Sequence, residues 1–135
     1  MDERFEEVEH TADIAIRVWG RDLAQLFANA AYGMACQLAD VATVERTVEH
    51  EIQLEDWDAE TLLVSWLDEF LYANERDGLV FTDFDMLEVS PTRLRAVVRG
   101  GPAPVRWHSI KAVTFNDLRI VRTAEGYETT IVFDV

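Results

Sequence analysis

Apolar and polar positions alternate along most of this chain, but in two segments the apolar residues recur at helical spacing. Residues 14–18 alternate with period two, which is typical of a half-buried strand. Residues 23–38 place apolar side chains three and four positions apart, the stripe of an amphipathic helix, and Asp22 precedes it as a candidate N-cap. Residues 62–71 carry a second stripe of this kind. The pattern therefore predicts a strand followed by a helix, and a further helix in the middle of the chain.

The sequence also predicts where the second helix begins and ends, and which segments around it form strands. Asp58 is positioned to cap this helix, and Asp77-Gly78 to end it. We expect further strands at 44–54, 79–89 and 94–98, then a hairpin of 118–123 and 127–133 around Ala124-Glu125-Gly126. Residues 100–104, Gly-Gly-Pro-Ala-Pro, read as a loop. This order predicts an α+β fold: a single two-layer domain over residues 1–135, with two helices packed on one face of a mostly antiparallel, mixed sheet.

Length and composition are those of a globular protein. A chain of 135 residues with 49% hydrophobic content can bury a core without disulfides. The one cysteine, Cys36, lies in the helical stripe and reads as a small core residue, which favours a reducing, cytoplasmic location. The N-terminus is acidic and opens no apolar run, so we expect no signal peptide, and no segment has the length of a membrane span.

The formal net charge is −14, and the charges are unevenly placed. Residues 91–135 carry seven of the twelve Lys and Arg residues but four of the 26 acidic residues. Such an acidic surface repels nucleic acid and anionic membranes, and suits a basic protein partner or a metal cation; a plain solubility surface explains it equally well. The arginines at 93, 95 and 99 share a strand face, which is either a modest contact surface or a solvated sheet face. It lacks the interleaved aromatic residues of an RNA surface.

Carboxylates near the two ends of the chain are the main candidates for chemistry. Asp134 and the terminal carboxylate of Val135 end the last predicted strand, and Asp13 borders the first. Terminal strands often lie side by side, so these oxygens could hold a hard cation such as Ca²⁺ or Mg²⁺. Alternatively, Asp13 caps a turn and the last strand simply ends at a sheet edge. Zinc is disfavoured, because His10 and His108 stand far apart with no Cys/His cluster near them.

Lys111 is the only lysine, beside eleven arginines. A desolvated lysine can form a Schiff base, but no dedicated base accompanies this one, and pairing with a carboxylate is the simpler interpretation. A catalytic alternative nevertheless stays open, namely a small hydrolase or lyase that uses Lys111 with Asp13 as acid/base. A general chaperone or acidic adaptor is a further alternative.

Several segments, taken in order, resemble the archease family. They are His10-Thr11-Ala12-Asp13-Ile14, the helix start with Leu23, Phe27, Ala30 and Ala31, the segment Leu62-Leu63-Val64-Ser65-Trp66-Leu67, the segment Ile110-Lys111-Ala112-Val113-Thr114, and the terminal Asp134-Val135. The resemblance covers nearly the whole chain. Its specificity comes from the combination of the first, fourth and last of these segments.

The resemblance implies a non-enzymatic activator of an RtcB-type RNA ligase, which joins RNA 2′,3′-cyclic phosphate or 3′-phosphate ends to 5′-hydroxyl ends in tRNA splicing and repair. Archease promotes guanylylation and multiple turnover of that ligase. The family's metal site falls on Asp13, Asp134 and Val135, with Ca²⁺ expected and Mg²⁺ or Mn²⁺ as alternatives. Lys111, His10 and Thr114 become candidates for contact with the partner, and no direct nucleic-acid or membrane binding is expected. The oligomeric state stays open.

The sequence also departs from the family pattern. Ser109 stands where an acidic residue is usual, and Phe115-Asn116 stand where Tyr-His is common. The loop from Gly100 to His108 is short. The carboxylate pair therefore has more support than any role for His108 or Asn116.

Overall fold

The computed structural model describes residues 4–8 and 13–135. In chain order, its elements are β1 (Phe5–Val8), β2 (Ile14–Gly20), α1 (Leu23–Leu38), the 3₁₀ turn η1 (Val41–Thr43), β3 (Val48–Glu55), α2 (Ala59–Asp77), β4 (Leu79–Val89), β5 (Arg93–Pro102), β6 (Ala112–Val113), β7 (Val121–Thr123) and β8 (Gly126–Asp134).

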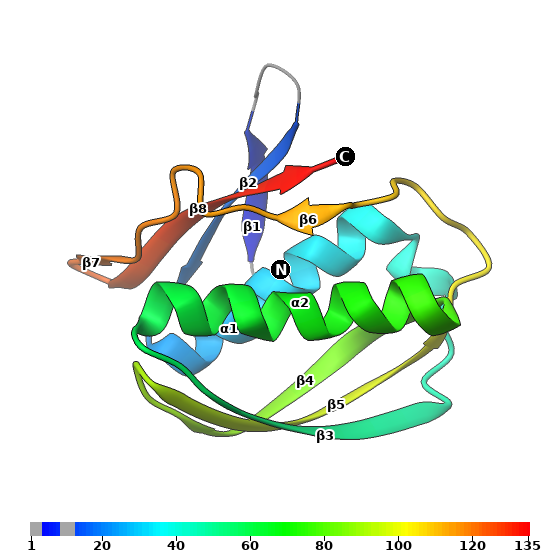
Figure 1. Ribbon diagram of the computed structural model, residues 1–135, viewed down its shortest axis with the longest axis horizontal. Helices are drawn as coiled ribbons and strands as arrows, with labels where there is room; N and C mark the ends of the chain where they lie inside the picture. The colour runs from blue at the N-terminus through cyan, green and yellow to red at the C-terminus, as the bar shows by residue number, and fades with distance from the viewer. Residues whose placement is uncertain (1–3, 9–12) are drawn as a thin grey trace.

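The strands form two antiparallel sheets with the helices between them (Figure 1). One sheet has the order β1-β2-β8-β6, with β7 also paired to β8, and the other has the order β3-β5-β4. Helix α1 contacts β2 of the first sheet and β4 of the second, and α2 contacts strands of both. The predicted α+β class and the antiparallel pairing are confirmed. The arrangement differs from the expectation in that the strands divide into two sheets, one on each side of the helices. The assignment of residues 1–135 to one domain remains a prediction.

The core lies on the helix faces that the apolar stripes predicted. Leu26, Phe27 and Met34 of α1 and Leu62, Trp66 and Leu67 of α2 are all at most 1% exposed. The indole N–H of Trp66 donates a hydrogen bond of 3.0 Å to the carbonyl of Phe27, which joins the two helices in the core. Satisfying this indole inside the core avoids the cost of a buried, unpaired donor.

Both predicted N-caps and the predicted helix end are confirmed. The carboxylate of Asp22 accepts a hydrogen bond from the Gln25 N–H, and that of Asp58 accepts one from the Thr61 N–H, each at 2.8 Å. Gly78 ends α2 with a left-handed φ of 70°, a conformation that glycine adopts without a steric penalty.

Residues 100–104 were expected to form a loop, and this is wrong for residues 100–102, which belong to β5 with Gly100 and Gly101 buried. Residues 103–104 lie outside the strand, as expected. A Cβ on Gly100 would lie 2.1 Å from the carbonyl oxygen of Val80, and one on Gly101 would lie 2.1 Å from that of Glu45. These glycines permit close backbone approach instead of breaking the strand.

One further expectation needs correction. Strand β3 begins at Val48 and not at residue 44, and residues 44–47 connect the 3₁₀ turn to the strand without belonging to either. His50 is exposed on the edge strand β3, and its ring is tilted against that of Phe81 with 5.2 Å between the centroids. No helix in the described ranges is long and apolar enough to span a membrane.

Candidate functional site

The C-terminal strand β8 lies inside its sheet, with β2 on one side and β6 on the other (Figure 1). Ile14 of β2 is paired with Phe133, so the register brings Asp13, the residue before β2, to the position opposite Asp134. On the other side, Ala112 of β6 is paired with Asp134. Residues far apart in the sequence therefore meet in one row at the end of β8.

The end of β8 is held by packing and by backbone hydrogen bonds. Phe133 is fully buried, and Asp134 directly after it is exposed. The Lys111 N–H donates a hydrogen bond of 2.7 Å to the carbonyl of Asp134. Strand ends fray unless they are tied down. The buried phenylalanine and the Lys111 hydrogen bond supply that anchor, so exposed Asp134 stands at the end of an ordered strand.

Lys111 is fixed through its main chain while its side chain is exposed. Across the ranges that the structure describes, its ammonium forms no ion pair with another residue. The expected simple pairing with a carboxylate is therefore not seen within those ranges. The lysine adds a positive charge beside the end of β8 without being desolvated.

Thr114 takes part in the turn that leaves β6. Its hydroxyl and its N–H each donate a hydrogen bond of 3.0 Å to the carbonyl of Val132. The same hydroxyl oxygen accepts a hydrogen bond from the Asn116 N–H at 3.2 Å. The Thr114 side chain therefore holds β6 against β8, and Asn116 contributes to this turn through its main chain.

Asp13 also borders a shallow hollow of about 500 Å³ at the end of α1. His108 lines this hollow together with Glu7 and Gln37. The main-chain N–H of His108 donates a hydrogen bond of 3.2 Å to the main-chain carbonyl of Gln37. The Gln37 side chain is 4% exposed and donates a hydrogen bond to Glu7. Sequence reasoning missed Glu7 and Gln37, although a glutamine within an apolar helix stripe was a usable signal.

The donors around Asp134 are oxygens, which suit a hard divalent cation better than zinc. Over the described residues, no three His, Cys, Asp or Glu side chains lie close enough together to hold a metal ion. A cation at this row would therefore need oxygen ligands besides the side chains of Asp13 and Asp134, such as water or backbone carbonyls. His10 and Thr11 of the same motif lie outside the described residues.

Cys36 offers no nucleophile. It is half-buried, and burial is the main cause that raises the pKa of its thiol. Burial likewise raises the pKa of the neighbouring Tyr32. Because the thiolate is the reactive form, a raised pKa leaves the thiol protonated and unreactive near neutral pH.

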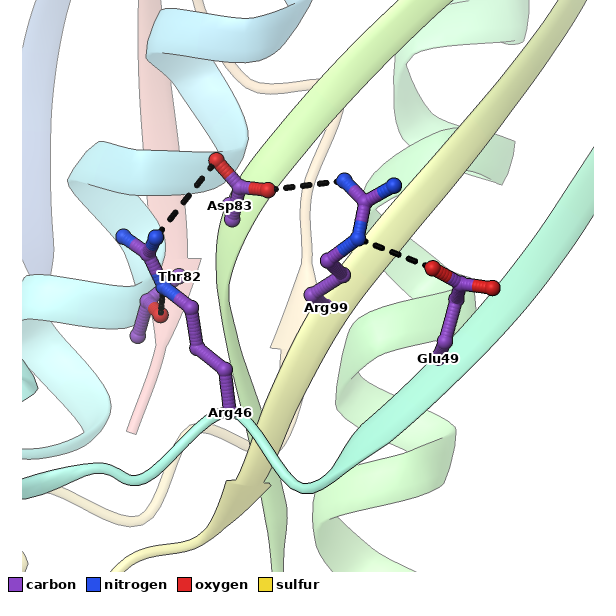
Figure 2. Close-up of polar contacts among 5 residues, drawn as sticks. All are labelled: Arg46, Glu49, Thr82, Asp83 and Arg99. Atoms are coloured by element: carbon purple, nitrogen blue, oxygen red, sulfur yellow. Dashed lines mark hydrogen bonds and ion pairs between the residues drawn. The ribbon is translucent and has the colours of Figure 1, made fainter.

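The arginine face of β5 is neutralised by the protein's own carboxylates. Figure 2 shows Arg99 between Glu49 and Asp83, with donor–acceptor distances of 2.9 Å on each side. Asp83 lies in turn 3.9 Å from Arg46. Hydrogen bonds to Asp83 and then to Glu49 raise the pKa of Arg99.

The other two arginines of this face are paired in the same way. Arg93 lies 3.1 Å from Glu55, and Arg95 lies 4.0 Å from Glu51. Each of these arginines therefore faces a carboxylate across the sheet. This pairing favours a solvated sheet face over a surface that recruits phosphate.

Comparison with known proteins identifies the family. The model of the Archease protein family (MTH1598/TM1083) matches residues 5–135. The chain belongs to the archease family. Protein archease of Methanosarcina acetivorans is 36% identical, with 98% of this chain and 96% of that protein covered. Protein archease of Methanopyrus kandleri is 34% identical, with 97% of this chain and 99% of that protein covered.

Solved structures agree with the archease fold. The solution structure of Methanobacterium thermoautotrophicum protein 1598 superposes with a TM-score of 0.80 at 27% identity, and covers 97% of this chain and 98% of that one. The crystal structure described as an archease, possible chaperone, from Thermotoga maritima gives a TM-score of 0.70 and covers both chains fully. At 20% identity, that second match supports the fold alone.

Proposed function

We propose that this archease activates an RtcB-type RNA ligase in the cytoplasm, promoting its guanylylation and multiple turnover without being an enzyme itself. The observation that supports this most directly is the register that sets Asp13 opposite Asp134 at the ordered end of β8. Family membership supplies the context for the partner.

In this proposal, the carboxylates of Asp13, Asp134 and the terminal Val135 hold a divalent cation, Ca²⁺ first and Mg²⁺ or Mn²⁺ as alternatives. The bound cation supplies a concentrated positive charge that a partner's phosphate or carboxylate groups can recognise. The chain's own contribution is to hold the carboxylates in place through the pairing of β2, β8 and β6. Lys111 then presents its exposed ammonium to the partner. His10 belongs to the sequence motif that contains Asp13, and Thr114 to the segment that contains Lys111, so both are further candidates for contact with the partner.

The decisive experiment is ligation by the cognate ligase with GTP, at limiting ligase, with and without archease. We expect wild-type archease to increase the number of turnovers, and Asp13→Ala or Asp134→Ala to abolish that increase. Glu125→Ala is the matched control, because Glu125 is an exposed carboxylate in the turn at the opposite end of β8. Binding of Ca²⁺, measured by calorimetric titration, should be weakened in the two aspartate variants and unchanged in the control.

The result also separates the remaining alternatives. If the wild type gives no gain in turnover, ligase activation is wrong; if both aspartate variants stimulate normally, the metal-site proposal is wrong. A general chaperone or adaptor predicts partner binding that is indifferent to both aspartates. A Lys111-dependent hydrolase or lyase predicts turnover of a small molecule without any ligase, but the exposure of Lys111 removes the desolvation that such chemistry needs.

A further inference from the structure

The strand that flanks the end of β8 is very short. Strand β6 consists of Ala112 and Val113, and it lies between β8, with which it pairs, and α2, which it contacts (Figure 1). Strands usually run to about three residues or more, because fewer residues supply too few ladder hydrogen bonds. The bonds made just before and just after β6 therefore decide how firmly this strand is held.

Hydrogen bonds fasten the chain to β8 on both sides of this short strand. On one side, the main-chain N–H of Lys111 donates to the main-chain carbonyl of Asp134 at 2.7 Å. On the other side, the main-chain N–H and the hydroxyl of Thr114 both donate to the main-chain carbonyl of Val132, each at 3.0 Å. The side chain of Thr114 thus adds a second bond, which needs its hydroxyl, to one that the main chain already makes.

The carbonyl that accepts both Thr114 bonds belongs to the buried part of the sheet. Val132 is fully buried, and β8 is paired with β2 on the side away from β6. The next residue, Phe133, is also fully buried and is paired with Val113. The Thr114 hydroxyl therefore ties β6 to the interior of the sheet, whereas Lys111 and Asp134 meet at its exposed end.

The single proton of the Thr114 hydroxyl is already in use. A threonine hydroxyl can donate one hydrogen bond, and this one is donated to Val132. Its oxygen also accepts a hydrogen bond from the Asn116 N–H at 3.2 Å, and the residue is half-buried. Thr114 could donate to a partner only by releasing Val132. Support of β6 therefore accounts for this side chain better than direct contact with a partner.

We propose that Thr114 is a positioning residue: its hydroxyl locks β6 to Val132, and β6 in turn holds Lys111 and Asp134 in place. The use of that end of β8 for binding a cation belongs to the proposed function, on which this role rests. Loss of the hydroxyl should leave the fold intact, because the helices and the pairing of β2 with β8 do not depend on it. Strand β6 should then separate from β8 more often.

Hydrogen exchange at the Lys111 amide, followed by NMR, tests this role without metal or ligase. Thr114→Val removes the hydroxyl and keeps a β-branched side chain, whereas Thr114→Ser keeps the hydroxyl. We expect the protection of the Lys111 amide to fall by about fivefold in Thr114→Val, which corresponds to the loss of one hydrogen bond. Thr114→Ser should stay within about twofold of the wild type. The amide of buried Leu67 in α2 reports opening of the whole fold and should lose less protection than Lys111.

Thr123→Val is the matched control. Thr123 belongs to β7, which also pairs with β8, and its hydroxyl accepts a hydrogen bond from the Glu125 N–H at 3.3 Å. The same change of side chain is thereby made at the opposite end of β8. Thr123→Val should leave the protection of the Lys111 amide unchanged.

Addition of Ca²⁺ connects this role to the proposed cation site. A cation that binds only while β6 and β8 are paired stabilises the paired state, so Ca²⁺ should raise the protection of the Lys111 amide. Excess Ca²⁺ should likewise restore protection in Thr114→Val, because Asp13 and Asp134 are still present. If Ca²⁺ changes nothing in the wild type, the cation site is wrong, while the comparison of valine and serine variants still decides the role of Thr114.

Several results would overturn the positioning role. They are an unprotected Lys111 amide in the wild type, equal protection in wild type and Thr114→Val, failure of Thr114→Ser to keep the protection, an equal loss at Leu67, or an equal effect of Thr123→Val. Direct contact of Thr114 with the partner gives a different result: Thr114→Val would then reduce stimulation of the ligase while the Lys111 amide kept its protection.

Discussion

The single lysine of the chain shows how the position of one residue limits its chemistry. Lys111 directly precedes β6, and its main chain is bonded to Asp134. Its side chain is exposed, so its ammonium is solvated. A solvated ammonium is a weak candidate for covalent catalysis but a good one for contacting an anionic group on a partner.

Asp58 gives a prediction about pH at the residue scale. Its carboxylate caps α2, and the hydrogen bond from the Thr61 N–H lowers the pKa of Asp58. A pKa that is lower in the folded state means that the ionised cap stabilises the fold above the unfolded value of about 3.9. That contribution is lost as the pH falls through the folded-state pKa. Asn caps a helix about as well as Asp but does not titrate, so Asp58→Asn separates the titration from the cap itself.

The measurement is the free energy of unfolding in urea for wild type and Asp58→Asn at several pH values between 7 and about 2.5. We expect wild-type stability minus variant stability to fall as the solution is acidified through the carboxylate range. A difference that stays constant over this range would contradict the assignment of the lowered pKa to the cap.

At the scale of the elements, Gly100 and Gly78 differ in the atoms that an added methyl group would contact. On Gly100 it would run into the backbone of β4, 2.1 Å from the Val80 carbonyl oxygen. On Gly78 it would meet the flexible guanidinium end of Arg106. We predict that Gly100→Ala destabilises the fold by about 3 kcal/mol or more, because backbone must shift. Gly78→Ala should cost about 1 kcal/mol, from its left-handed φ of 70°. Urea unfolding of both variants tests this order, and equal costs would contradict it.

The elements that the sequence predicted well are those with long, regular patterns. Both helices and their caps were predicted because each is specified locally, by an apolar stripe and one side chain. The short strands β1 and β6 were missed, since two to four residues carry too little periodicity. The division into two sheets was missed for another reason: alternation marks a strand but does not specify its partner.

The candidate site, like the fold, could be predicted from the sequence only in part. The expectation that the terminal strands lie side by side is confirmed by the pairing of β2 with β8, which sets Asp13 opposite Asp134. The contribution of β6 depends on long-range pairing that no local pattern encodes. The position of His108 at the end of α1 has the same origin, because it follows from backbone contacts with Gln37.

At the scale of the whole molecule, the two sheets separate two surfaces. The end of β8 that carries Asp134 belongs to the five-stranded sheet, and β3 lies at an edge of the three-stranded sheet on the other side of the helices (Figure 1). The helices between them supply a shared core. One surface can therefore be altered by substitution of exposed residues without changing the other.

The net charge of −14 gives a prediction that belongs to the whole molecule. Self-repulsion grows with the square of the net charge, whereas exposed ion pairs such as those on β5 contribute about 0–1 kcal/mol each. Salt screens both, and the Debye length falls from about 30 Å at 0.01 M to about 3 Å at 1 M. Because repulsion is the larger effect, added NaCl should increase the free energy of unfolding in urea. Glu75→Lys moves the net charge from −14 to −12 and should show a weaker dependence on salt. A decrease in stability with added salt would mean that the ion pairs outweigh the net charge.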